Sequence, residues 1–443
     1  MNIVGLSDQR AGLHARSLIV AALIGIPLLA WAGTVGGRYL WAAYHYRAAR
    51  QALEAYRLRQ ARDHINQCLS VWTQDPKAHI LAVRAARMDQ DYDDAELHLN
   101  EVQRVTGVSE TTNLEWAMLR AHYGDLDSVE NYLQSLVQEG HPESRLILDA
   151  LAAGYLRMYR NVDAEQCIHI WLEREPNCPQ ALYYRGLGWQ RLHGYQKAVD
   201  DFTVVVEQDP DRDNARIRLA ACLLEVQQLD QALSHMKILY AKHPKDPETV
   251  VALANCYYNL GDIDEGCDLL DCLLAENPSY APALSGRGQL AMENGETEQA
   301  LRYFRRALAE SPLDMRANYE LSQCLEILGK DKEAKEQRGK LVTLQKNIER
   351  LMEISNHEMT KNPNDPALHT ELGILMLSLS KEELGERWLV SALQKDKNYG
   401  PAHKALADYY ERKGETAKAS EHREKAKNAE PAKIEPRSAE KKP

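Results

Sequence analysis

Five prolines recur at one fixed interval in the middle of the chain. Pro176, Pro210, Pro244, Pro278 and Pro312 stand 34 residues apart. With 17 prolines among 443 residues, four further matches at one spacing would arise by chance on the order of once in a few hundred thousand tries. A period of this length predicts an array in which one short supersecondary unit is repeated and stacked on its neighbours.

Other positions share this period. One column of small residues comprises Ala164, Ala198, Ala232, Gly266, Ala300 and Ala334, and a second comprises Ala152, Gly186, Ala220, Ala254, Gly288 and Ser322. A column of large apolar residues comprises Ile168, Phe202, Met236, Leu270 and Phe304. Two antiparallel helices need small residues where their backbones approach, and large side chains fill the space to the next unit. The columns therefore predict a pair of helices in each unit.

Apolar spacing inside a unit agrees with this. Residues 181–192 and 196–207 each carry apolar residues at helical spacing, and the polar turn His193–Gly194 joins them. The proline after the second stretch ends that helix, because it lacks an N–H group and clashes with the preceding turn. The abundance of Ala, Leu and Glu, with only 2 Phe, favours an all-α protein over a sheet protein.

A 34-residue helix-turn-helix unit with these columns resembles the tetratricopeptide repeat. The segment from Tyr183 to Pro210 carries the pattern through Tyr184, Arg185, Gly186, Trp189, Tyr195, Ala198, Phe202 and Asp209. The resemblance implies an all-α, right-handed superhelical solenoid of about eleven such repeats. It also implies that the first helix of each unit lines a concave groove for partner proteins or peptides.

The repeat pattern divides the chain into parts. It is well formed over 145–330, degenerate over 45–142, and present again over 363–431. Between 145–330 and 363–431, the sequence departs from the 34-residue period. This segment, residues 331–362, is predicted to be an extended helical insertion. The residues Leu341, Leu344, Ile348 and Leu351 form a short coiled-coil-like seam there. This segment is either an overlong second helix that packs on its neighbours or an arm (331–361) for self-association or partner contact.

The two ends of the chain differ from the repeats. Leu18–Val35 is apolar and uncharged, and residues 17–37 just suffice to cross a bilayer of about 30 Å at about 1.5 Å per residue. This predicts a transmembrane anchor over 17–37, after a tail over 1–16. The alternative is a signal peptide cleaved after Ala32, at the Ala30–Trp31–Ala32 site. Residues 432–443 are rich in Lys, Glu and Pro and are predicted to be disordered.

Charged residues and cysteines predict the side of the membrane. Four arginines closely follow the apolar segment, so the positive-inside rule places the repeat body in the cytoplasm of a single-pass membrane protein. Three of the eight cysteines, Cys222, Cys256 and Cys324, fall on one repeat position and are expected to be buried hydrophobic thiols. Thiols without partners agree with a reducing compartment.

No catalytic, cofactor or metal motif emerges from the sequence. His357–Glu358 lacks the second histidine of a zinc-protease helix, and His64 with Cys68 lacks a third ligand. We find no G-x-S-x-G and no P-loop pattern. The net charge of −11 argues against a nucleic-acid partner, which needs a basic stripe. We therefore expect a chain that is not an enzyme.

The resemblance places a set of polar, aromatic and apolar residues in the groove. The predicted peptide-binding residues are Tyr183, Leu187, Gln190, Val251, Asn255, Tyr258, Asn259, Gln289, Met292, Tyr319 and Gln323. Tyr, Asn and Gln offer flat apolar area and hydrogen bonds to an extended peptide. The alternative is that these residues make ordinary contacts between repeats. Some relatives clamp a C-terminal carboxylate with Lys and Asn, but Val251 stands one turn before Asn255 here, so we expect no such clamp.

Together these features predict a membrane-anchored scaffold that binds partner proteins or peptides. Three other classes stay open. The chain is a secreted or periplasmic assembly factor if the leader is cleaved. It is an enzyme or enzyme subunit if its chemistry lies outside known motifs. It is a structural spacer if charge reversal in the groove leaves its function intact.

Overall fold

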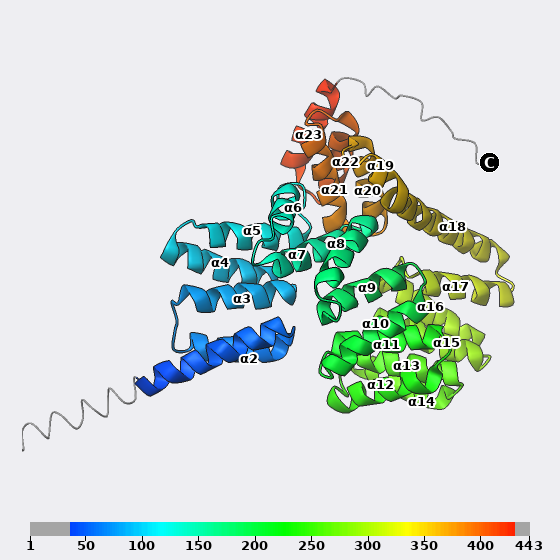
Figure 1. Cartoon of the computed structure of the whole chain (residues 1–443). Coiled ribbons are helices and arrows are strands. Elements are labelled where there is room, and N and C mark those ends of the chain that lie inside the picture. The colour runs from blue at the N-terminus through cyan, green and yellow to red at the C-terminus, as the bar shows by residue number, and fades with distance from the viewer. Residues whose placement is uncertain (1–35, 430–443) are drawn as a thin grey trace, which may run out of the picture. The chain divides into compact units, whose positions relative to one another are not determined.

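The computed structural model describes residues 36–429, and every regular element within that range is a helix (Figure 1). The chain divides into two compact units, residues 1–119 and 120–443, which are described separately. The boundary falls inside α5 (Glu110–Tyr123). The predicted all-α class is confirmed.

The first unit is built from the degenerate repeats. Helical residues 36–54 are followed by α2 (Leu58–Leu69), α3 (Pro76–Met88), α4 (Tyr92–Thr106) and the start of α5. Asp75 caps α3 by accepting a hydrogen bond from the backbone N–H of Ala78. The core between α3, α4 and α5 comprises Val83, Ala86, Ala95, Leu99 and Leu119.

The second unit begins with one helix and five successive helix pairs, followed by the first helix of the next pair. Its helices up to the break in the repeat are α6 (Glu130–Gln138), α7 (Ser144–Arg157), α8 (Asn161–Arg174), α9 (Pro179–Arg191), α10 (Tyr195–Gln208), α11 (Asp213–Glu225), α12 (Leu229–Lys242), α13 (Pro247–Leu260), α14 (Ile263–Glu276), α15 (Ala281–Glu293), α16 (Thr297–Glu310) and α17 (Met315–Ile327). The five pairs run from α7/α8 to α15/α16, and α17 is the first helix of the next pair. Each helix packs on the next, and the first helices of neighbouring pairs also touch, as α13 does with α15 and α15 with α17. This is the packing expected of a stacked array.

A long helix then leads to the C-terminal pairs. Figure 1 shows α18 (Asp331–Glu353) running from α17 toward α20. It continues into the π-helical turn η1 (Ile354–Glu358) and α19 (Met359–Lys361). The remaining helices are α20 (Pro366–Ser378), α21 (Glu382–Lys395), α22 (Gly400–Arg412) and α23 (Thr416–Asn428).

The structure explains the small and large columns. A Cβ atom added at Gly186 would lie 2.7 Å from Cε1 of Phe202, and one at Gly288 would lie 2.7 Å from Cε1 of Phe304. Both rings are fully buried. The second helix of each of these pairs therefore places its aromatic ring directly on the backbone of the first, which only glycine permits.

Polar pairs also recur inside the helix pairs. The Nδ1 atoms of His79 and His98 are 2.9 Å apart, as are those of His403 and His422. Nε2 of His403 lies 3.0 Å from the carbonyl oxygen of Lys397, six residues earlier. Each first histidine is buried, so it ties its helix both to the partner helix and to the loop before it.

In other helix pairs, different residue types occupy the two positions that the histidines hold in these pairs. Arg216 contacts Nδ1 of His235 at 3.1 Å and donates to the carbonyl of Pro210 at 2.8 Å. Asn318 pairs with Gln337 and donates to the carbonyl of Pro312 at 2.9 Å. The first and second members are 19 residues apart in all these pairs, so the link is a property of the repeat.

The eight cysteines are free thiols, and six of them are buried. Burial raises the pKa of Cys222 and Cys324 to about 11 and that of Cys256 to about 12. They act as the small hydrophobic core residues that the repeat position predicts.

The predicted single-pass membrane location is corrected by the structure. Within residues 36–429, no helix combines the length and apolar character needed to cross a bilayer. The helices found there are repeat helices that pack against one another. The tail over 1–16, the anchor over 17–37 as far as residue 35, and the tail over 432–443 lie outside the described residues.

Candidate functional site

The predicted groove residues lie on four first helices. Three are on α9, four on α13, two on α15 and two on α17. Because α13, α15 and α17 are in contact, the structure brings the residues of these three helices onto neighbouring surfaces. The residues on α9 stand apart, since α11 lies between α9 and α13 in the stack. We call the surface formed by α13, α15 and α17 the groove face.

The groove residues differ in how accessible they are. Tyr319 is 50% exposed and Asn259 is also exposed, so both are available to a partner. Gln289 is only 3% exposed and is part of the interior of the stack. The other residues of the groove face are half-buried. Of the predicted residues on the groove face, the exposed ones therefore lie on α13 and α17, while α15 contributes the buried Gln289.

Charged residues that the sequence reasoning missed complete the groove face. Tyr258 Oη donates to Oε1 of Glu293 at 3.1 Å, and the guanidinium carbon of Arg316 is 5.6 Å from the centre of the Tyr258 ring. Burial, followed by the hydrogen bond to Glu293, raises the pKa of Tyr258. Burial also raises the pKa of Glu320, against the opposing charge of Arg316. Helical spacing could have indicated Glu293, which follows Gln289 by four residues and so shares its helix face.

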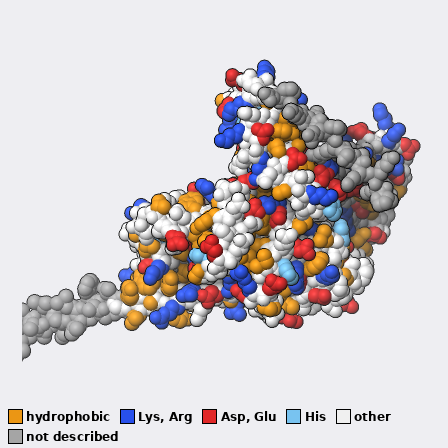
Figure 2. Space-filling model, turned by 45° about the horizontal axis from the view of Figure 1, so that its top comes forward, with side chains coloured by type: hydrophobic (Ala, Val, Ile, Leu, Met, Phe, Trp, Pro, Cys, Tyr) orange, Lys and Arg blue, Asp and Glu red, His pale blue; other side chains and the backbone are white. Residues whose placement is uncertain are grey.

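On α9, the predicted residue Tyr183 is engaged within the stack. Its ring centroid is 5.8 Å from that of Phe202, and the guanidinium carbon of Arg212 lies 4.4 Å from its centre. The contact with Phe202 lies within one helix pair, and the contact with Arg212 joins neighbouring repeats. Figure 2 shows acidic and basic side chains interspersed over the face that it presents, without a continuous basic stripe.

A second candidate site lies between segments that are remote in sequence. In the second unit, α21 reaches the turn between α5 and α6. The guanidinium carbon of Arg387 lies 3.3 Å from the centre of the Tyr123 ring, and Arg387 donates to the Tyr123 carbonyl. Lys395 Nζ is 2.7 Å from Oδ1 of Asp127. We call the contacts of α21 and the preceding Lys381 with residues 123–159 the clasp.

Further polar contacts extend the clasp. Arg157 Nη2 lies 3.6 Å from Oε2 of Glu383, and Lys381 Nζ lies 5.3 Å from the centre of the Tyr159 ring. Gly124 permits the close approach of Arg387, because a Cβ atom there would lie 3.1 Å from its Nη1 atom. Gly124 also has a φ of +101°, which side chains rarely adopt.

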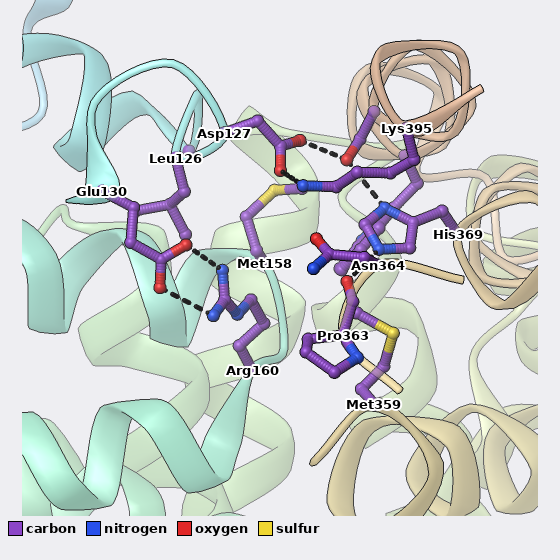
Figure 3. Close-up of a pocket in the computed structure, with 13 residues that line it drawn as sticks. Leu126, Asp127, Glu130, Met158, Arg160, Met359, Pro363, Asn364, His369 and Lys395 are labelled. Atoms are coloured by element: carbon purple, nitrogen blue, oxygen red, sulfur yellow. Dashed lines mark hydrogen bonds and ion pairs between the residues drawn. The ribbon is translucent and has the colours of Figure 1, made fainter. Parts of the chain in front are cut away.

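Two cavities of about 50 and about 420 Å³ border the clasp. Figure 3 shows the smaller one, with Glu130 and Arg160 facing Asp127, Lys395 and His369 across it. Arg160 makes two hydrogen bonds of 2.8 Å to Glu130. Burial opposes the charge of Arg160, but these bonds to Glu130 outweigh it and raise the pKa of the guanidinium. Two charged pairs, Glu130 with Arg160 and Asp127 with Lys395, thus lie in the wall of this cavity beside apolar residues.

A hydrogen-bonded chain crosses the smaller cavity. His369 Nε2 lies 2.8 Å from the Pro363 carbonyl, and its Nδ1 lies 2.7 Å from Oγ of Ser391, which also bonds Asp127. Burial lowers the pKa of His369. The Ser391 hydroxyl donates to Oδ2 of Asp127, and Lys395 supplies the ionic partner of the same carboxylate.

No residue of the clasp was predicted as a site. Residues 124–127 mark a repeat turn in the sequence, but their contact with Ser391 spans 264 residues. A single sequence shows no period that would connect such positions. Among residues 36–429, no group of three or more His, Cys, Asp or Glu is placed to hold a metal ion.

Comparisons with known proteins identify the repeat. Residues 285–336 and residues 223–290 match two family models described as tetratricopeptide repeat. The chain therefore contains tetratricopeptide repeats in the stretch that carries the groove face. The predicted resemblance is confirmed for these repeats.

Individual relatives match only in part. The chain is 29% identical over 112 residues to cellulose synthase operon protein C of Pseudomonas fluorescens (strain SBW25), which is 24% of this chain and 9% of that protein. It is 27% identical over 92 residues to the probable UDP-N-acetylglucosamine–peptide N-acetylglucosaminyltransferase SEC of Arabidopsis thaliana, which is 21% of this chain and 9% of that protein. The chain thus spans about a tenth of the length of these curated relatives.

A solved structure resembles the chain over a longer stretch. The alignment with a chain of the human IFIT1 dimer with m7Gppp-AAAA covers 80% of this chain and 90% of that chain. The two are 16% identical, and the TM-score is 0.42.

Proposed function

We propose that this chain is a scaffold that binds partner proteins or peptides on its groove face and performs no catalysis itself. The observation that carries the proposal is the contact of three first helices of tetratricopeptide repeats, which together present Tyr319, Asn259 and Tyr258. The helix pairs account for the chain from 58 to 428, so the described part contains no separate domain for catalysis.

The residues of the groove face suit a peptide ligand. The ring of Tyr319 supplies flat apolar area at a small entropic cost, because it has only two side-chain torsions. Asn259 already donates to the Asn255 carbonyl at 2.7 Å, which holds its amide in place with a free oxygen and a second N–H for a partner. Glu293 and Arg316 add charges of both signs, so the surface can orient a partner as well as hold it.

Site-specific photocrosslinking tests this proposal. A photoreactive amino acid replaces Tyr319 on the groove face and, in a matched control, Arg302 on the exposed side of α16. We expect defined protein adducts from position 319 and none from position 302. Adducts at position 302 alone, or at neither position, would contradict binding on the groove face.

A further inference from the structure

The clasp between α21 and residues 123–159 combines polar contacts with the buried apolar side chains of Leu126, Met158 and Trp388, which line the smaller cavity. Arg387 on Tyr123, Lys395 on Asp127 and Arg157 on Glu383 are all charged or hydrogen-bonded pairs. Val390, an apolar residue of α21 beside the larger cavity, stays 40% exposed. Contacts that include so many polar pairs and border open cavities resemble the interfaces across which domains of one chain move.

The C-terminal pairs are joined to the rest of the second unit by one helix. Residues 338–343 of α18 are exposed apart from the half-buried Leu341, and Gly339 has open space around its Cα. A glycine inside a helix weakens it, so this stretch is the place where the helix bends most easily. Beyond it, Arg350 donates to Glu371 at 2.6 and 2.9 Å and thereby fixes the end of α18 to α20.

The second unit is therefore a stack whose two ends meet. The helix pairs run continuously from α7 to α17, and α18 returns the chain so that α21 contacts the start of the unit. A stack of repeats has a curvature set by small rotations between neighbours. A contact between its ends holds that curvature at one value.

We propose that the clasp is a releasable closure. Residues 344–429 move as one block about the exposed part of α18. Release of Lys395 from Asp127, of Arg387 from Tyr123 and of η1 from α8, where Asn161 donates to Asn356 at 3.0 Å, lets the intervening repeats change their curvature. The groove face lies within those repeats. A partner that fits the relaxed curvature would open the clasp, and this last clause rests on the proposed function.

The charged contacts of the clasp make the closure sensitive to ionic strength. The side chains of Lys395 and Asp127 are 22% and 19% exposed, and Glu383 is 53% exposed. Salt screens the more exposed pair of Arg157 and Glu383 more than the largely buried pair of Lys395 and Asp127. Rising ionic strength therefore weakens the clasp chiefly at this outer pair, and neutralising Lys395 weakens it further, while the apolar cores of the helix pairs stay intact.

Distance measurements between two spin labels test the closure without any partner. Labels are attached at Gln138→Cys and Lys397→Cys, both exposed, in the full chain with Cys267→Ser and Cys272→Ser. At about 50 mM salt we expect one narrow distance distribution, and at about 500 mM salt a second, longer one. Lys395→Gln should show the longer distance already at low salt.

Two further variants distinguish opening of the clasp from misfolding of the protein. The charge exchange Lys395→Asp with Asp127→Lys should restore the short distance at low salt. Lys245→Gln removes an exposed ion pair with Glu276 elsewhere in the unit and should leave the distance unchanged. A distance that is unaffected by salt and by Lys395→Gln would overturn the closure, while the groove face could still bind partners. Failure of the photocrosslinking with a salt-sensitive distance would instead overturn the proposed function alone.

Discussion

At the scale of single residues, glycine positions show how the repeat is enforced. Gly186 and Gly188 lie two residues apart on α9, but only Gly186 faces the ring of Phe202. A Cβ atom at Gly188 would meet nothing within 4 Å. Substitutions at Gly186 therefore report on close packing against Phe202. Substitutions at Gly188 report only on the lower helix propensity of glycine.

Gly186→Ala should destabilise the protein by about 1–3 kcal/mol, because the aromatic ring or the helix must shift to admit the methyl group. Gly188→Ala should stabilise it by up to about 1 kcal/mol, because alanine favours the helix. Urea-induced unfolding followed by circular dichroism measures both changes. Equal effects of the two substitutions would show that the Phe202 contact does not determine the glycine column.

These residue-scale contacts were predictable, because they repeat. The small and large columns are local in sequence and recur every 34 residues, so one chain suffices to detect them. The histidine pairs are equally regular, since His79–His98 and His403–His422 share a spacing of 19 residues, but the residue types at these two positions change between repeats. Gln289 shows the opposite error, because position on a helix face does not reveal how deeply the neighbouring helices bury a side chain.

At the scale of helices, capping by side chains is selective. Asp246 precedes α13 and accepts hydrogen bonds from the backbone N–H of Thr249 at 2.8 Å and from its hydroxyl at 2.6 Å. Asp262 precedes α14 but makes no capping hydrogen bond through its side chain. Asp246→Ala should therefore cost about 1 kcal/mol of stability, and Asp262→Ala clearly less. Chemical unfolding of the two variants at neutral pH tests the difference, and a larger loss for Asp262→Ala would refute this assignment.

The histidine pair between α22 and α23 makes that helix pair sensitive to pH. Burial, then the charges of His403 and Lys425, lower the pKa of His422 below its ordinary 6.5, against the opposing charge of Glu421. The unfolded chain therefore takes up a proton first as the pH falls. Neutral His422 contributes its full stability above about pH 6.5, and this contribution declines as the pH falls toward its lower pKa in the folded state.

An uncharged replacement for the pair already exists in the chain. Asn318 and Gln337 occupy the equivalent positions on α17 and α18. The double substitution His403→Asn with His422→Gln should flatten the fall in stability between about pH 7 and about pH 5, relative to the unmodified protein. Unfolding midpoints over this range test the effect, and an unchanged slope would locate the sensitivity in other groups.

At the scale of the whole chain, a stack of repeats couples mainly neighbouring units. The clasp is an exception, since it joins residues 264 positions apart. The sequence revealed the array and the break in its period after Ala334, but it contained no signal for the return contact of α21. Contacts of that kind depend on the sum of many small rotations between repeats, which no local pattern records.

The most direct test of the central claim is the affinity of a crosslinked partner for variants of the groove face. The partner identified through position 319 is purified and titrated against the unmodified chain, Tyr319→Ala and the control Arg302→Ala. Exposed aromatic anchors often dominate binding energy, so we predict at least about tenfold weaker binding for Tyr319→Ala and no change for Arg302→Ala. Equal affinity of all three proteins would contradict a partner site on the groove face.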